Sequence, residues 1–292
     1  MKRQTYSELI DEFKDLDEYI LRLGLKVKPS DRVHQAIGQI TKVNSVLGKP
    51  EFEDILKKVN VNGAFVFSHT ELAELASALE FVKTQDTAMA RLKLEKILKG
   101  PLLTSDENTT NNEARNTVFE LNLGSLLSRG GFKVKLKENP DLVATKYKRN
   151  YFIQAKRVYS ENGIEKNINE AYTQLKRDLI GKDKNTFGVI AISITRAITD
   201  GNKLLEAGSE KSGLARLSGE LLQIIDDYKH CWKKIPEKNI IAVILHISCT
   251  SHIKDEGLFS FANYHTLTNI HDEGKKAKIF PTFRNDFFSL IP

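Results

Sequence analysis

The chain has 292 residues, of which 40% are hydrophobic and 28% are charged, with 17 glycines and 7 prolines. This composition excludes a collagen, a pure coiled coil and a largely disordered chain. The formal net charge is +6, which leaves an anionic partner open.

The sequence contains no apolar run of the length that spans a membrane, and its first residues carry charges where an export signal has an apolar stretch. Its two cysteines, Cys231 and Cys249, are too few for a secreted disulfide framework. We therefore expect a cytoplasmic protein that does not bind membranes.

From residue 5 to about residue 100, apolar residues recur at helical spacing and predict four to six helices. Ser68 or Thr70 is a candidate cap for the helix that carries Leu72, Leu75 and Leu79. The polar segment 102–112 is the best candidate linker, although it could also be an N-cap region. We expect a helical domain over 1–105, for recognition, partner binding or oligomerisation, and a second domain over 106–292.

The pattern changes after the candidate linker. A helix is expected over 112–128, ending at Gly130-Gly131, and short strands over 132–137, 141–145 and 151–155. A helix over 164–180, a continuous apolar strand over 187–195, a helix over 204–229 and a second apolar strand over 240–248 follow. This order predicts an α/β fold, with a mixed sheet flanked by helices.

The basic excess lies in the middle of the chain. Residues 1–112 carry 16 Lys and Arg against 17 Asp and Glu, residues 113–184 carry 15 against 9, and residues 185–292 carry 13 against 12. Contacts from Lys and Arg to phosphates supply most non-specific affinity for nucleic acids. A basic surface that serves solubility alone fits the same counts, so both interpretations stay open.

Polar side chains gather at the end of the third short strand. Because strand residues alternate, Gln154 and Lys156 point to one side, where Asp141 from the neighbouring strand and Glu120 from the preceding helix could converge. Oxygen ligands of this kind suit Mg²⁺, and a lysine beside the metal can position a water for phosphodiester hydrolysis. Taken singly, Asp141 fits a turn after Pro140, and Gln154 and Lys156 fit a solvated strand edge.

The segment NPDLVAT, residues 139–145, followed by QAKR, residues 154–157, resembles the PD-(D/E)xK nuclease superfamily. The glutamine form of the motif is most similar to the Mrr-like restriction endonucleases. Upstream, Phe119-Glu120 and Gly131-Phe132 resemble the first helix of that superfamily. The resemblance covers about residues 112–195 and implies a restriction-endonuclease-like fold.

The resemblance also implies roles for individual residues. Asp141 would be the principal ligand of Mg²⁺ or Mn²⁺, Gln154 the second ligand, and the backbone carbonyl of Ala155 a third. Lys156 would orient the nucleophilic water, and Glu120, with Glu113 as its rival, would hold metal-bound water. Tyr172 and Gln174 lie where some superfamily members have auxiliary polar residues. Arg157, Lys176 and Arg177 are candidate phosphate contacts, because they flank the site and belong to the basic segment.

From this resemblance we expect a metal-dependent endonuclease that cuts DNA, acts in the restriction of foreign or phage DNA, and works with a helicase or another ATPase. Double-strand cleavage by a chain with one site implies a homo-oligomer. Alternatives are an inactive nucleic-acid-binding module, a structural or regulatory helical protein with the α/β region as scaffold, a repair or junction nuclease, and an RNase of the same fold.

The remaining histidines and cysteines give weaker signals. His246, Cys249 and His252 offer ligand types that suit zinc, and a fourth ligand would have to come from elsewhere, such as His230, Cys231 or His265. No second closely spaced pair accompanies them, which favours core or strand-end roles. His34 and His69 are isolated in the sequence, and we expect them to lie at the surface or to cap helices.

Overall fold

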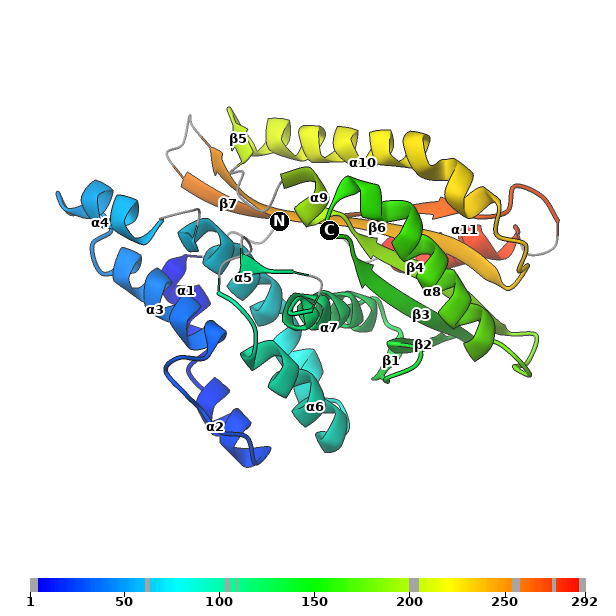
Figure 1. Cartoon of the computed structure of the whole chain (residues 1–292), viewed down its shortest axis with the longest axis horizontal. Coiled ribbons are helices and arrows are strands. Elements are labelled where there is room, and N and C mark those ends of the chain that lie inside the picture. The colour runs from blue at the N-terminus through cyan, green and yellow to red at the C-terminus, as the bar shows by residue number, and fades with distance from the viewer. Residues whose placement is uncertain are drawn as a thin grey trace. The chain divides into compact units, whose positions relative to one another are not determined.

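The computed structural model describes residues 5–60, 64–102, 106–108, 110–199, 205–253, 258–274 and 277–288. The chain divides into two compact units (Figure 1). The first comprises residues 1–122, 199–210 and 249–262, and the second comprises residues 123–198, 211–248 and 263–292. The first unit thus continues past residue 105 and includes part of the helix that we expected over 112–128.

Six helices within the described residues precede residue 100, as the apolar spacing predicted. They are α1 (Tyr6–Asp11), α2 (Leu16–Arg22), α3 (Arg32–Asn44), α4 (Phe52–Val59), α5 (Ala64–Lys83) and α6 (Thr87–Leu98). Thr5 caps α1 through a reciprocal capping box with Glu8, and Asp86 caps α6. Helix α3 contacts α1, α4, α5 and α6, so its buried Ile40 and Val43 lie at the centre of the helical core.

Two expectations for this region were wrong. Ser68 and Thr70 lie inside α5 and do not cap it: the Ser68 hydroxyl donates to Gln39 at 2.7 Å and the Thr70 hydroxyl to the Val66 carbonyl at 3.0 Å. His69 is buried, and burial lowers its pKa to about 4. The apolar spacing did not distinguish a helix start at residue 64 from one near residue 70.

The first unit also buries charges, and these are paired. Glu71 forms ion pairs with Arg32 and, at 3.2 Å, with Arg115, which contacts Glu107 at 2.9 Å. A buried charge without a partner is strongly destabilising, so this network fixes which helical faces meet in the core.

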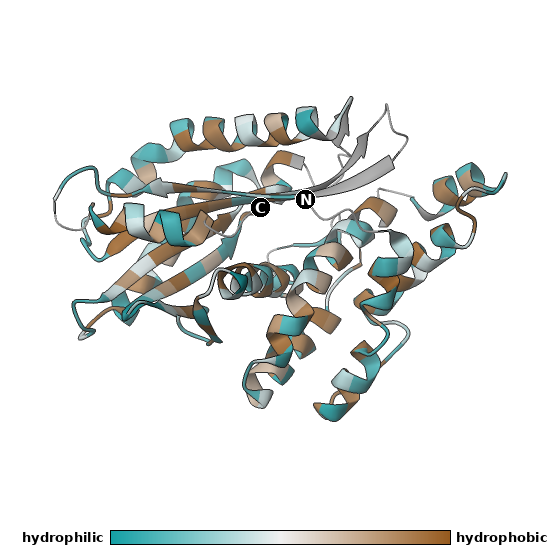
Figure 2. Cartoon of the chain, turned by 180° about the vertical axis from the view of Figure 1, so that it is seen from behind, coloured by the Kyte–Doolittle hydropathy of each residue, from teal (hydrophilic) through white to brown (hydrophobic). Residues whose placement is uncertain are grey.

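The described strands form one mixed sheet in the order β1-β2-β3-β4-β6-β5, with β7 paired to β6. Their bounds are β1 (Lys133–Leu136), β2 (Leu142–Lys146), β3 (Arg149–Arg157), β4 (Thr186–Ser193), β5 (Leu205–Ala207), β6 (Ile240–Ile253) and β7 (Leu258–Asn269). The pairs β1–β2 and β2–β3 are antiparallel, whereas β3–β4, β4–β6 and β5–β6 are parallel. All eight residues of β4 are buried, which explains the apolar run over 187–192 in this strand (Figure 2).

Helices cover the sheet of the second unit. They are the last part of α7 (Glu113–Arg129), α8 (Ile164–Asp178) after the short 3-10 turn η3 (Glu161–Gly163), α9 (Thr195–Thr199), α10 (Glu210–Lys233) and α11 (Ile279–Phe288). This arrangement confirms the expected α/β class, with a mixed sheet flanked by helices and a helical N-terminal region. No helix in the described ranges is both long enough and apolar enough for a membrane span.

The two faces of the sheet in the second unit carry different side chains. Gly188 of β4 pairs with Phe152, and a side chain at Gly188 would touch Leu175 and Leu179 at the end of α8. Helix α8 therefore covers the face to which Phe152, and by alternation Gln154 and Lys156, belong. Phe283 of α11 packs on Tyr151, with ring centroids 4.8 Å apart, so α11 covers the opposite face.

Candidate functional site

Asp141 lies directly before β2, opposite Gln154 of β3. In the antiparallel register, Leu142 pairs with Ile153, which places the side chains of Asp141 and Gln154 next to each other. One carboxylate oxygen of Asp141, Oδ2, accepts hydrogen bonds from the Gln154 side-chain nitrogen at 2.6 Å and from the Ala155 backbone N–H at 2.8 Å. The structure thus joins two residues that the sequence predicted to converge.

Within the described residues, the side-chain oxygen of Gln154 has no hydrogen-bond partner. The side chain is 3% exposed, its nitrogen is used by Asp141, and its Oε1 has no hydrogen-bond partner among the described residues. A buried acceptor of this kind is rare, because it loses its water without gaining a new donor. A cation bound beside Asp141 would satisfy it, and an amide oxygen with a carboxylate is a donor set that Mg²⁺ accepts.

Lys156 follows Gln154 on the same face of β3, two residues closer to the end of the strand. It is half-buried, and within the described part of the chain its side chain forms no ion pair or hydrogen bond. Asp141, Gln154 and Lys156 are therefore close neighbours on one side of the sheet, and we call them the β3-end site.

Glu120 belongs to the first compact unit, where its carboxylate forms a buried ion pair with Lys93. Its rival Glu113 is exposed and pairs with Lys96 at 2.8 Å. Both predicted candidates from α7 are thus engaged by lysines of α6.

Arg157 points to the other face of the sheet from the β3-end site. It follows Lys156 in β3 and pairs with Ser193, which in turn pairs with His246, so these three share a face. His246 is buried there between Ser193 and Asn263, each at 3.0 Å. Burial lowers the pKa of His246 to about 3, and the charge of Arg157 acts in the same direction.

Lys176 and Arg177 lie at the end of α8 that returns toward the start of β4, away from Lys156 and the end of β3. Lys176 forms an ion pair with Glu237 at 3.1 Å, which raises the pKa of the lysine, and its ammonium group lies 5.9 Å from the centre of the Tyr172 ring. Arg177 contacts Asp178 at 3.4 Å. The structure does not bring the predicted phosphate contacts or Tyr172 to the β3-end site.

Gln174, the other predicted auxiliary residue, lies in a shallow hollow on the outer surface of α8 and, like Gln154, has a buried side-chain oxygen without a hydrogen-bond partner in the described chain. Strand alternation could not predict which way the Gln174 side chain points, because this residue lies on a helix.

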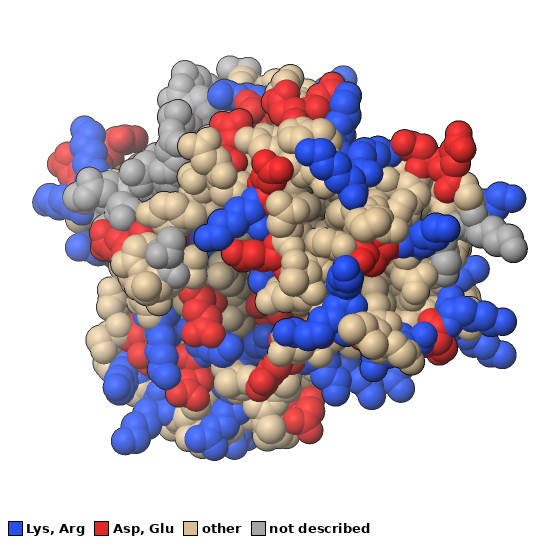
Figure 3. Space-filling view, turned by 45° about the vertical axis from the view of Figure 1, so that its right-hand side comes forward, with Lys and Arg blue, Asp and Glu red and all other residues tan. Residues whose placement is uncertain are grey.

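The basic residues of the middle segment are exposed mainly on β1 and in the turns after β2 and α8. They include Lys133, Lys135, Lys148, Lys182 and Lys184. Figure 3 shows Lys and Arg side chains in several groups on one face of the protein, with acidic side chains between them. Lysines on the edge strand β1 also discourage pairing with another sheet, so the charge serves a structural role there as well.

Comparisons with protein-family models, with curated proteins and with solved structures find no match for this chain. Any function assigned to the chain therefore depends on the geometry of its own residues.

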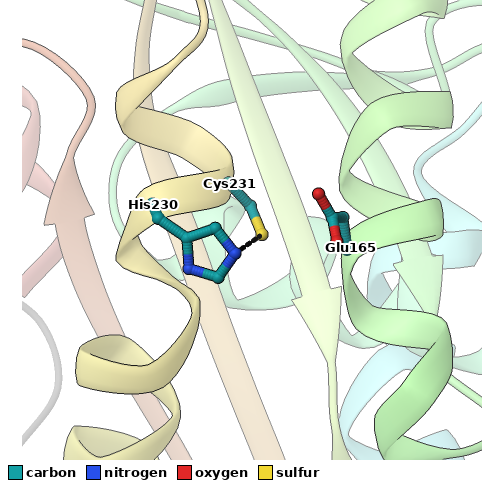
Figure 4. Close-up of side chains that lie close together, drawn as sticks. All are labelled: Glu165, His230 and Cys231. Atoms are coloured by element: carbon teal, nitrogen blue, oxygen red, sulfur yellow. Dashed lines mark hydrogen bonds between the residues drawn. The ribbon is translucent and has the colours of Figure 1, made fainter.

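The structure brings together one group of possible ligands that the sequence analysis did not predict as a group, although His230 and Cys231 were named as candidate zinc ligands. Glu165 of α8 and His230 and Cys231 of α10 lie together (Figure 4). His230 and Cys231 are adjacent in sequence, but Glu165 is far from them along the chain, and no spacing pattern links the three. The sequence analysis named His246, Cys249 and His252 as residue types that can bind zinc. His246 is a buried core residue, and the side chains of Cys249 and His252 lie outside the described residues.

Proposed function

We propose that the protein is a metal-dependent nuclease of restriction-endonuclease-like fold that hydrolyses phosphodiester bonds in DNA at the β3-end site. The observation that carries this proposal is the buried Asp141–Gln154 pair, with its unsatisfied amide oxygen and with Lys156 two residues further on the same face. The fold assignment rests on the motif resemblance together with the order of helix, three strands, helix and strand from α7 to β4.

Asp141 and Gln154 are the residues that would hold Mg²⁺ or Mn²⁺, with the Ala155 carbonyl as a further donor. When bound, such an ion polarises the phosphoryl group and lowers the pKa of a water. The Ala155 N–H and the Gln154 amide fix the orientation of the Asp141 carboxylate. Lys156 would donate a hydrogen bond to the attacking water or to the phosphoryl oxygens, on which negative charge develops.

The predicted contacts at Arg157, Lys176 and Arg177 are not part of this mechanism, because they lie on the other face of the sheet or are paired at the far end of α8. Exposed lysines of β1 and of the neighbouring turns are the better candidates for phosphate contacts. A role in restricting foreign DNA, a helicase partner and pairing of two copies for double-strand cleavage remain proposals that rest on the resemblance.

The test is a cleavage assay with the purified full chain. Supercoiled plasmid, linear duplex and single-stranded RNA are incubated with Mg²⁺, Mn²⁺ or EDTA. We expect DNA cleavage that requires the metal, and a loss of roughly 100-fold or more in rate for Asp141→Asn and for Lys156→Ala. Lys42→Ala, which changes an exposed lysine of α3, is the control and should cleave like the parent protein.

Full activity in both site variants would overturn the proposed site. Cleavage of RNA alone would favour the RNase alternative, and DNA binding with no cleavage of any substrate would favour an inactive binding module. Thermal unfolding of each variant shows whether a loss of activity is a loss of fold.

A further inference from the structure

A second group of polar side chains lies between α8 and α10, separate from the β3-end site. Glu165 is in the first turn of α8, and His230 and Cys231 are in the last turns of α10. One ligand atom of each lies within 4.8 Å of the others, and among the described residues no other group of three or more His, Cys, Asp or Glu side chains meets this condition. In Figure 4 the Cys231 sulfur lies between the imidazole and the Glu165 carboxylate.

The distances suit a tetrahedral metal ion. The Cys231 sulfur and the His230 Nε2 are 3.3 Å apart. Zinc bonds of about 2.3 Å to sulfur and about 2.0 Å to nitrogen place two such ligands about 3.5 Å apart at the tetrahedral angle. A small movement of either side chain would therefore bring both atoms to bonding distance of one ion.

The orientation of the imidazole fits the same role. His230 Nδ1 lies 2.9 Å from the backbone carbonyl of Asp227, which can only accept, so Nδ1 carries the proton in that contact. The lone pair of neutral His230 is then on Nε2, the atom that faces Cys231. Histidines that bind metals are commonly held in this way by a hydrogen bond from their other ring nitrogen.

The ligand types select the class of metal. Thiolate and imidazole favour zinc and similar late transition metals, whereas Mg²⁺ prefers oxygen ligands throughout. Cys231 is buried, whereas Glu165 and His230 are exposed, and Glu165 also lines the hollow on the surface of α8. An ion bound by these three residues would thus contact buried Cys231 on its inner side and would be accessible to solvent on its outer side.

We infer that Glu165, His230 and Cys231 form a binding site for Zn²⁺ or a similar transition-metal ion, with a fourth position open to water or an external ligand. The site joins the start of α8 to the end of α10. Nearby, the Tyr228 hydroxyl of α10 donates at 3.3 Å to the backbone carbonyl of Glu161, which lies in η3 directly before α8. The inference is independent of the proposed nuclease activity.

The experiment is a Co²⁺ titration of the metal-free full chain, followed by absorption spectroscopy. Tetrahedral Co²⁺ with a thiolate ligand gives a sulfur-to-metal charge-transfer band and strong visible bands. We expect both bands to saturate at one Co²⁺ per chain and to disappear when Zn²⁺ is added in equal amount, because Zn²⁺ binds such sites more tightly than Co²⁺.

Variants assign the site. Cys231→Ser should remove the charge-transfer band, whereas Cys249→Ser, which changes the other cysteine of the chain, should keep it. Changing a residue that only hydrogen-bonds to a metal ligand typically weakens metal binding by roughly 10–100-fold. Glu165→Gln and His230→Asn change direct ligands, so each should weaken Co²⁺ binding by at least that factor. Both of these side chains are exposed, so these variants test the site even if Cys231→Ser does not fold.

The inference is overturned if the folded chain gives no charge-transfer band, or if the band is lost in Cys249→Ser and kept in Cys231→Ser. It is also overturned if Glu165→Gln and His230→Asn both bind Co²⁺ as tightly as the parent chain.

Discussion

The side chain of Gln154 does two things at the β3-end site. Its nitrogen donates to Asp141, and its oxygen is left buried without a partner in the described chain. A glutamate at this position could not donate, and its carboxylate would lie beside that of Asp141. The amide therefore holds the site together when no cation is present, and it brings one negative charge less to a cation.

This balance predicts the behaviour of Gln154→Glu. The substitution replaces the Gln154 side-chain nitrogen, which lies 2.6 Å from the Asp141 carboxylate, with a carboxylate oxygen. Without metal, the repulsion between the two negative charges should destabilise the fold near neutral pH. We expect a loss of roughly 1–3 kcal/mol in the free energy of unfolding, which is recovered as the pH falls and one carboxyl binds a proton. Urea unfolding at several pH values measures this effect.

Mg²⁺ should stabilise Gln154→Glu more than the parent chain, because the ion binds the folded state and neutralises both carboxylates. Gln174→Glu is the control, since Gln174 also has an unpartnered buried oxygen within the described residues, whereas the hydrogen bond to Asp141 is made by Gln154. Equal stabilisation of both variants by Mg²⁺ would contradict a specific site at Gln154.

His246 predicts a loss of stability in acid. Burial lowers its pKa to about 3, whereas an exposed histidine has a pKa near 6.5. Between these values the unfolded chain binds a proton that the folded chain does not, so the free energy of unfolding falls as the pH falls through this window. At about pH 4.5 this one group accounts for roughly 2–3 kcal/mol.

Replacing His246 by Gln removes this titration while keeping a polar side chain near Ser193 and Asn263. Between about pH 7.5 and about pH 4.5, the free energy of unfolding should therefore fall by roughly 2–3 kcal/mol less in the variant than in the parent chain. Urea unfolding at both pH values measures this difference. Parallel losses in the two proteins would show that His246 is not kept neutral by burial.

At the scale of elements, the turn between β2 and β3 is tight and strained. Lys146 pairs with Arg149, which leaves a two-residue loop in which Tyr147 and Lys148 both have positive φ, of 50° and 62°. Such turns prefer Asn-Gly, because the left-handed conformation costs a residue with a side chain about 1 kcal/mol.

Lys148→Gly should therefore stabilise the protein by about 0.5–1 kcal/mol in urea unfolding. Lys135→Gly is the control, because Lys135 is also an exposed lysine but has the extended conformation of β1, where glycine should destabilise by about 0.5–1 kcal/mol. A destabilising effect of both substitutions would be the contrary result.

The elements that could be predicted from sequence are those whose burial leaves a regular pattern. Strands β4 and β6 contain the apolar runs 187–192 and 240–245, and β1 alternates lysine with buried Val134 and Leu136. Strand β5 has three residues and was assigned to the start of a helix that in fact begins at Glu210. Strand β7, helix α9 and helix α11 were not predicted, the last because Pro281 interrupts its pattern, although proline is tolerated in a first helical turn.

The candidate site was predictable to the extent that it lies on neighbouring strands. Strand alternation places Gln154 with Lys156, and hairpin register brings Asp141 beside them. The same alternation placed Arg157 on the other face, which the basic character of the segment alone did not reveal. Pairs formed across long distances in sequence, such as Lys176 with Glu237, leave no local signal.

At the scale of the whole molecule, the helical region does not end at residue 105. Arg115 and Glu120 of α7 form buried ion pairs with Glu71 and Lys93 in the same compact unit. A fragment cut at residue 105 would lose both buried ion pairs together with α7, and breaking a buried pair costs about 3–5 kcal/mol.

We therefore expect the fragment 1–105 to be less stable than the fragment 1–129 by about that amount, as measured by urea unfolding followed by circular dichroism. In the longer fragment, Glu120→Gln should lower the free energy of unfolding, because it leaves the Lys93 charge without its partner. Adding Lys93→Met to that variant should recover part of the lost stability, because it removes this charge. Equal stability of the two fragments would mean that α7 adds nothing to the helical core.

The strand order has a consequence for synthesis on the ribosome. Strands β4 and β5 both pair with β6, which is made after them. At about 5–20 residues per second, β5 emerges roughly 2–10 s before the end of β6 with which it pairs. During that interval the apolar strand β4 lacks the neighbour that it has in the finished sheet. A nascent chain at this stage exposes an edge that invites aggregation, so its yield in cells should depend on chaperones that bind the chain before β6 is complete.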